Sequence, residues 1–240
     1  MKLGFIIGTT LVASMSASVE AGVLGYAAFA RTASNGNVVI DVFTVVSNAS
    51  DRLLQVYNVN LTTTQDDATL ATFVQQAGTA TRGWKPDANT STRSNIVDSF
   101  MTIGVDGGAP YMGEYYASAG TGADGSFTNW SSLAPTVPAN AGWFLSPPTL
   151  PDNLAASMSG MTGTRTNTGT AGSSNLGIWC AHLVMAPGTA SVFWAATSAV
   201  KDGVTAATVT TTAPSTNLIP APGALALIGL AGFSSRRRRA

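Results

Sequence analysis

The segment Val38–Val46 constrains the fold of this 240-residue chain more than any other. It is rich in β-branched residues and apolar on both faces except at Asp41, which is typical of a β-strand. The polar turn Ser34–Asn37 precedes it and contains an Asn-Gly pair, which accepts the positive φ of a tight hairpin. The apolar segment Leu24–Arg31 lies before that turn. We therefore expect these two segments to pair as antiparallel strands.

The same pattern of apolar segments between polar, Gly-rich or Pro-rich turns continues to about residue 212. No helical period of 3.6 residues occurs outside the two ends of the chain, and residues 69–77 fit a short helix or a strand. We expect consecutive segments joined by short polar turns to pair with each other. Further strands are expected at Leu53–Leu61, Ile96–Gly104, Ile178–Met185, Ala190–Val200 and Thr205–Thr212.

These segments predict an all-β fold, an antiparallel β-sandwich with long loops, over residues 22–212. Residues 106–177 contain Gly-Gly, Pro-Pro and Thr/Gly/Ser stretches and are expected to supply the loops. A β-barrel is the main alternative. Residues 213–218 are expected to be a linker because they contain Pro214 and follow the last predicted strand.

The composition excludes several classes of protein. Only 10% of the residues are charged and 45% are apolar, which excludes a highly charged disordered chain and a coiled coil. The twelve basic residues include the run Arg236–Arg239. Between residues 22 and 218 there are seven basic and eleven acidic residues, so this part is mildly acidic. A nucleic acid is therefore not an expected partner.

The N-terminus resembles an export signal. Met1-Lys2 gives a positive start, the apolar run Leu3–Ala13 follows, and a short polar segment ends in Val19-Glu20-Ala21. The apolar run is shorter than the roughly 20 residues that span a bilayer. We expect residues 1–21 to be a signal peptide that signal peptidase cleaves after Ala21. The alternative is a buried first strand or helix.

The C-terminal segment, residues 219–240, has three parts. A proline motif comes first, an uncharged apolar stretch follows, and a basic run ends it. Arginines cross a bilayer only at high cost and favour the cytoplasmic side. The 17 residues 219–235 would reach about 25 Å as a helix, less than the bilayer's apolar thickness of about 30 Å. We therefore expect a hydrophobic helix that anchors the chain only temporarily. The motif and the basic run consist of Pro220, Ala221, Pro222, Gly223, Arg236, Arg237, Arg238 and Arg239.

This segment resembles the PEP-CTERM sorting signal of Gram-negative bacteria, the substrate tag of exosortase-type membrane proteases. The family's motif usually has Glu where this chain has Ala221. The resemblance implies export, transient anchoring in the inner membrane, cleavage near the proline motif, and release to the cell surface or an extracellular matrix. An ordinary anchor that is never cleaved is the alternative. The middle of the chain is loosely similar to uncharacterised ectodomains that carry such tails, which implies no activity.

Residues that could carry catalysis are few. Cys180 and His182 are two apart on a predicted strand and would share a face, so a thiolate–imidazole dyad is conceivable. Ile178 and Val184 would make that face apolar, which favours a structural role in the core. The chain has no Gly-x-Ser-x-Gly elbow, P-loop, Rossmann fingerprint or His-Glu-x-x-His motif.

Loop residues offer two kinds of binding site. Trp84, Trp130 and Trp143 fall in or near predicted loops, where exposed rings could stack on the sugars of an extracellular polysaccharide. Asp87 and Asn89 are the best of several weak Ca²⁺ candidates, and no other metal or cofactor is expected. The sequence thus predicts a non-catalytic, exported protein of the cell surface or matrix. The alternative is a secreted carbohydrate-binding module that uses its loop aromatics.

Overall fold

The computed structural model describes residues 22–65, 68–76, 83–86, 91–104, 114–117, 127, 130–146 and 153–219. The predicted cleavage residue Ala21 and the Ca²⁺ candidates Asp87 and Asn89 lie outside these ranges. The residues of the expected sorting signal also lie outside them, so that signal stays a prediction: Pro220, Ala221, Pro222, Gly223, Arg236, Arg237, Arg238 and Arg239.

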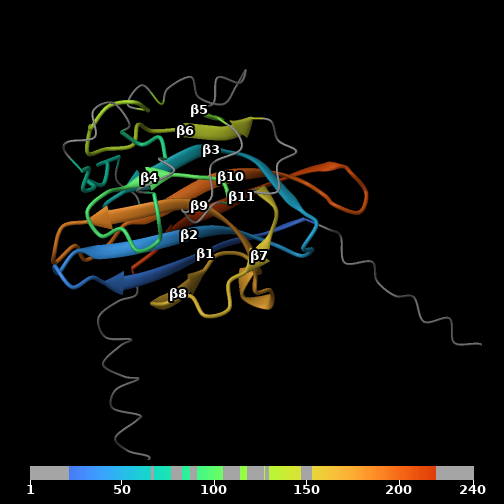
Figure 1. Ribbon diagram of the computed structural model, residues 1–240, viewed down its shortest axis with the longest axis horizontal. Coiled ribbons are helices and arrows are strands. Elements are labelled where there is room, and N and C mark those ends of the chain that lie inside the picture. The colour runs from blue at the N-terminus through green and yellow to red at the C-terminus, as the bar shows by residue number, and fades with distance from the viewer. Residues whose placement is uncertain are drawn as a thin grey trace, which may run out of the picture.

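Within the described part, the chain is all-β, and its strands form two antiparallel sheets (Figure 1). This agrees with the fold class that the sequence predicts. No helix in that part is long and apolar enough to cross a membrane.

Sheet A contains the hairpin that the Asn-Gly turn predicts. Its strands run in the order β4, β9, β2, β1, β8, and β7 also pairs with β9. All of its pairings are antiparallel. The strands are β1 (Val23–Thr32), β2 (Val38–Val46), β4 (Phe100–Met101), β7 (Ala156–Ser157), β8 (Thr164–Asn167) and β9 (Leu176–Met185).

Sheet B packs against one face of sheet A. Its order is β11, β10, β3, β6, β5, again with antiparallel neighbours. The strands are β3 (Arg52–Thr62), β5 (Glu114–Ala117), β6 (Ala141–Ser146), β10 (Phe193–Lys201) and β11 (Thr208–Asn217).

Two expected hairpins are wrong. We expected Val38–Val46 to pair with Leu53–Leu61, and Ile178–Met185 with Ala190–Val200. Instead, β2 and β9 pair with each other in sheet A, while β3 and β10 pair with each other in sheet B. The edges of β2 are already occupied by β1 and β9, so β3 has no edge there to join. Both short connections therefore cross from one sheet to the other.

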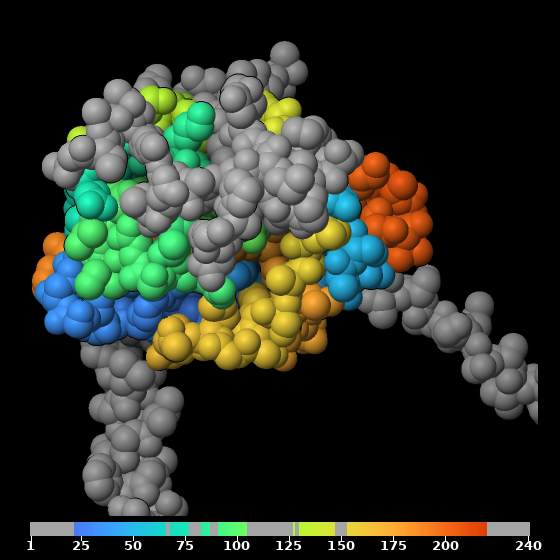
Figure 2. Space-filling view, viewed as in Figure 1, coloured from blue at the N-terminus to red at the C-terminus, as the bar shows by residue number. Residues whose placement is uncertain are grey.

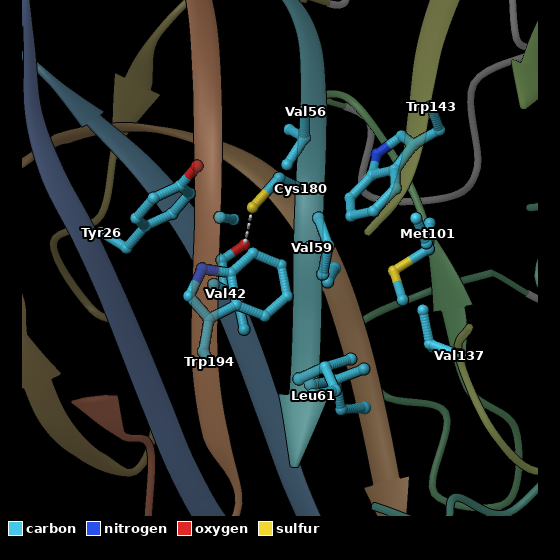
Figure 3. Packing of buried hydrophobic residues seen from close by; sticks show 14 of the residues in the cluster. Tyr26, Val42, Val56, Val59, Leu61, Met101, Val137, Trp143, Cys180 and Trp194 are labelled. Carbon is cyan, nitrogen blue, oxygen red and sulfur yellow. Dashed lines mark hydrogen bonds between the residues drawn. The ribbon is translucent and has the colours of Figure 1, made fainter. Parts of the chain in front are cut away.

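The main core lies between the sheets and contains side chains from both (Figure 3). Val42 of β2 and Val56 of β3 are fully buried in it. A set of three hydrogen-bonded hydroxyl groups joins the two sheets inside this core. The Tyr26 hydroxyl lies 2.7 Å from the Ser198 hydroxyl, and Thr44 Oγ1 lies 2.9 Å from the same oxygen. These contacts connect β1 and β2 with β10 across the sandwich.

A second, smaller core covers the opposite face of sheet A. Phe29, Phe43 and Trp179 project from the strands, and Met158 packs on them from the segment that contains β7 and β8. Successive side chains of a strand point to opposite faces. Even-numbered residues of β2 therefore face the main core and odd-numbered ones the second. This arrangement explains why Val38–Val46 is apolar on both faces.

Residues 213–218 are not a linker. β11 continues to Asn217, and Leu218 is 1% exposed in the main core, where its N–H donates to the Val192 carbonyl. Ile219 packs against the same core. Pro214 is tolerated because β11 is an edge strand whose register against β10 shifts at this point. The folded domain therefore extends to the residue before the proline motif.

Other segments are less regular than the sequence predicts. Of the expected strand Ile96–Gly104, only Phe100–Met101 is a strand. Residues 68–76 contain isolated bridges at Leu70 and Thr72 and no helix. β5, β6, β7 and β8 lie in the region that was expected to be loops. β5, β7 and β8 have at most four residues, which is too short for a clear alternation of apolar side chains.

Candidate functional site

The three tryptophans proposed to bind sugar are buried. Trp84 and Trp143 are 0% exposed and Trp130 is 9% exposed. The indole N–H of Trp84 donates to the Ala134 carbonyl at 3.1 Å, and that of Trp143 to the Thr102 carbonyl at 3.0 Å. A sugar stacks on an exposed ring face, and these faces pack against other aromatic rings instead. The expectation that they project from exposed loops is wrong.

Cys180 and His182 do not share a face. In the register between β2 and β9, Val42 pairs with Ala181 and Phe43 pairs with Trp179, so Cys180 is an extra residue. This β-bulge breaks the alternation of side chains. Cys180 enters the main core, whereas His182 contacts the rings of Phe100 and Trp179 on the other face. A dyad of these two residues is therefore excluded.

Cys180 is held as a thiol. Its Sγ donates to the Val42 carbonyl at 3.2 Å (Figure 3). Burial raises the pKa of Cys180 to about 12 and outweighs the hydrogen bonds to Thr44, which lower it. The nucleophilic form of cysteine is the thiolate. The side chain is also fully buried, so Cys180 acts as a small apolar residue of the core.

His182 belongs to a buried polar network on the outer face of sheet A. Its Nδ1 lies 2.6 Å from Oδ1 of Asp41, and its Nε2 lies 2.9 Å from the Asn95 carbonyl. The other carboxylate oxygen of Asp41 accepts from Arg31 Nη1 at 2.5 Å. Arg31 Nη2 donates to the Arg93 carbonyl. The network thus joins β1, β2 and β9 to the 92–95 loop.

The geometry of this network fixes one hydrogen of the ring. A carbonyl oxygen can only accept, so His182 Nε2 carries a hydrogen. Asp41 accepts from Arg31 through one carboxylate oxygen and lies against Nδ1 of His182 through the other. Both ring nitrogens of His182 are therefore engaged.

The surroundings of His182 leave no room for a substrate at the ring. Its side chain is 0% exposed, and the Phe100 ring stacks on it with centroids 4.9 Å apart. Trp179 meets it edge-on at 5.9 Å. The network fixes the 92–95 loop on the sheet and has no free ring nitrogen for acid–base catalysis.

A surface hollow of about 620 Å³ opens beside this network. Arg31 lines it from β1, Arg93 and Ser94 from the loop, and Ser159 from the segment that follows β7. Figure 2 shows residues 91–104 in green and residues 153–167 in yellow, next to each other on this side of the molecule. The hollow is therefore built from two segments that are far apart in sequence.

A second hollow, of about 640 Å³, lies at the end of the sandwich formed by the β2–β3 and β10–β11 connections. Arg52, Lys201 and Asp202 line it with several small or apolar residues. The Thr205 N–H, with help from Val204 N–H, holds the pKa of Asp202 below its usual value. Both amides belong to the same tight turn, so this carboxylate shapes the β10–β11 connection.

Comparisons with family models, curated proteins and solved structures found no match to this chain. Its function is therefore argued from its own residues. Sequence reasoning singled out His182 but missed its partners. Asp41 was visible as the one charged residue of an apolar strand. Nothing in the sequence pointed to the Asn95 carbonyl, which lies 87 residues from His182, or to Arg31, which reaches the network through Asp41.

Proposed function

We propose that this is an exported protein of the cell surface or extracellular matrix that acts without catalysis and is sorted by its C-terminal segment. One observation carries the proposal: the order of proline motif, apolar stretch and Arg236–Arg239 at the end of the chain. The arginines halt translocation because they cannot cross the bilayer cheaply. The apolar stretch is too short to hold the chain firmly, which suits a segment that an exosortase-type protease later removes.

The position of the folded domain supports this proposal. Leu218 is buried in the main core and Ile219 packs on it, so the described domain reaches the residue that precedes the proline motif. Cleavage near this motif would separate the apolar stretch from an intact sandwich. The released domain would keep its last strand and its core. Two separate functions, folding and anchoring, are thus encoded in adjacent segments.

The absence of catalysis is supported by the chemistry of the described residues. The only histidine has both ring nitrogens engaged, and the only cysteine is a buried thiol on the other face of the sheet. The carbohydrate-binding alternative relied on Trp84, Trp130 and Trp143. These side chains are buried in the core, so their rings are not available to a sugar. A structural role at the cell surface is therefore the better supported function.

The test is to replace the four C-terminal arginines in the full-length protein and follow its fate in an exosortase-containing host. Replacing all four with Gln removes the positive charge, and the matched control replaces all four with Lys and retains it. We expect the Lys variant to be processed and released like the wild type. The Gln variant should accumulate unprocessed or be mislocalised. Equal processing and release of both variants would contradict the role of Arg236, Arg237, Arg238 and Arg239.

A further inference from the structure

We propose that Met161 is an oxidation site, at which hydrogen peroxide converts the thioether to a sulfoxide and Arg93 binds the new oxygen. Met161 lies in the segment between β7 and β8 and lines the hollow of about 620 Å³ beside the His182 network. Its sulfur accepts a hydrogen bond from Arg93 Nη1, which reaches it from the 92–95 loop. The site therefore combines a sulfur that solvent can reach with a cationic donor.

Burial separates Met161 from the other methionines of the described residues. Met101 and Met185 are 0% exposed in the main core, and Met158 is 3% exposed in the second core. Met161 packs at the edge of the second core and stays partly exposed toward the hollow. A thioether does not ionise, so access to the oxidant decides which methionine reacts. Met161 should therefore react first.

The oxidation is a transfer of one oxygen atom. A lone pair of the Met161 sulfur attacks one oxygen of hydrogen peroxide, so that an S–O bond forms and the O–O bond breaks. The sulfur loses two electrons, and the second peroxide oxygen leaves as water with both peroxide protons. The sulfur has two lone pairs and accepts one hydrogen from Arg93, so a lone pair remains for the attack.

The position of Arg93 suits the product better than the reactant. A thioether is a weak acceptor, whereas the sulfoxide oxygen is polar and carries a partial negative charge, so its bond to a guanidinium is stronger. The backbone that carries Arg93 is fixed, because Arg31 Nη2 donates to its carbonyl and His182 Nε2 donates to the Asn95 carbonyl in the same loop. A small rotation of the flexible Met161 side chain brings the new oxygen to the guanidinium.

Oxidation at Met161 spares the second core. The Met161 N–H donates to the Met158 carbonyl at 3.2 Å, so the two methionines belong to one turn. Met158 packs with Phe43 and Trp179, and a sulfoxide there would place a polar oxygen among apolar side chains. Met161 instead consumes the oxidant at the rim, where Arg93 supplies a hydrogen bond to the product.

The first experiment incubates the full-length protein with hydrogen peroxide at neutral pH and locates the added oxygen by peptide mass spectrometry. In the native protein, Met161 should be oxidised at least roughly tenfold faster than Met101, Met158 and Met185. In guanidinium chloride the four rates should become similar, because burial is lost. The oxidation site would be overturned if Met161 reacts no faster than Met158 in the native protein, or if its advantage persists after unfolding.

The second experiment tests Arg93 by urea denaturation before and after oxidation. Met161→Leu keeps the apolar volume without the reactive sulfur, so its change on oxidation measures the contribution of every other methionine. After that correction, oxidation should leave the wild-type midpoint unchanged or raise it, and should lower the midpoint of Arg93→Gln, which lacks the cationic donor. A lower wild-type midpoint, or equal shifts in the two proteins, would overturn the binding of the sulfoxide by Arg93. If Arg93→Gln does not fold, the wild-type midpoint still decides.

Discussion

Cys180 illustrates how burial alone decides the chemistry of a side chain. Its pKa of about 12 means that almost no thiolate forms near neutral pH. We predict that iodoacetamide does not alkylate the native protein at pH 8 and alkylates one site after unfolding in guanidinium chloride, as read by mass spectrometry. Native and unfolded protein reacting at the same rate would show that Cys180 is accessible.

Asp98 is a half-buried carboxyl whose charge destabilises the fold. Burial raises its pKa, and this outweighs the hydrogen bond from Gln76 N–H and the attraction of His182, which lower it. The folded protein thus holds this proton more tightly than the unfolded chain does. The resulting stability is complete below the ordinary aspartate pKa of about 3.9 and is lost as the pH rises through the raised value.

Asp98→Asn should therefore raise the free energy of unfolding at pH 7 and change it little near pH 3.5. Asparagine keeps the Oδ1 acceptor for the Gln76 N–H, a contact of 2.9 Å in the wild type. Urea titrations at the two pH values measure the difference. A variant that is less stable than the wild type at pH 7 would mean that the charged carboxylate stabilises this loop.

β11 shows where pattern reading succeeds and where it stops. The Thr- and Val-rich segment at 205–212 predicted a strand, and its residues 208–212 belong to β11, an edge strand. Pro214 suggested that the strand had ended, but a proline is accepted on an edge strand at a shift in register. The burial of Leu218 could not be predicted, because it depends on Val192 and the core beneath it.

We predict that Leu218→Ala lowers the free energy of unfolding by about 2–4 kcal/mol, since it removes a buried side chain from the main core. Thr216→Ala, two residues earlier on the partly exposed strand end, should cost less than about 1 kcal/mol. Both values come from urea denaturation followed by tryptophan fluorescence. If the two variants are equally stable, residues 213–218 behave as the linker that the sequence suggested.

The long strands were largely predictable and the way they assemble was not. Val38–Val46 and its partner across the Asn-Gly turn were placed correctly, because alternation and turn chemistry are local. The crossing from β2 to β3 depends on which strand edges are already occupied, which is a property of the whole sheet. The bulge at Cys180 also depends on the pairing of distant strands, because it arises where Cys180 has no partner on β2.

At the scale of the whole molecule, the main core contains all three tryptophans that the sequence offered as binding groups. Trp84 and Trp130 lie in irregular segments and Trp143 lies in β6, and all three side chains belong to the main core. Their burial could not be inferred from local sequence, because a tryptophan in a loop is equally able to stay exposed and bind a sugar. The network around His182 could not be inferred either, because its members are far apart in sequence.

The central claim is that the chain is exported and trimmed at both ends, leaving the sandwich intact. The measurement that tests it most directly is the intact mass and location of the mature protein in the native host. We predict a product lighter than the 24.4 kDa chain, beginning at Gly22, lacking Arg236–Arg239 and recovered outside the cell. A full-length 24.4 kDa product in the cytosol would contradict the claim.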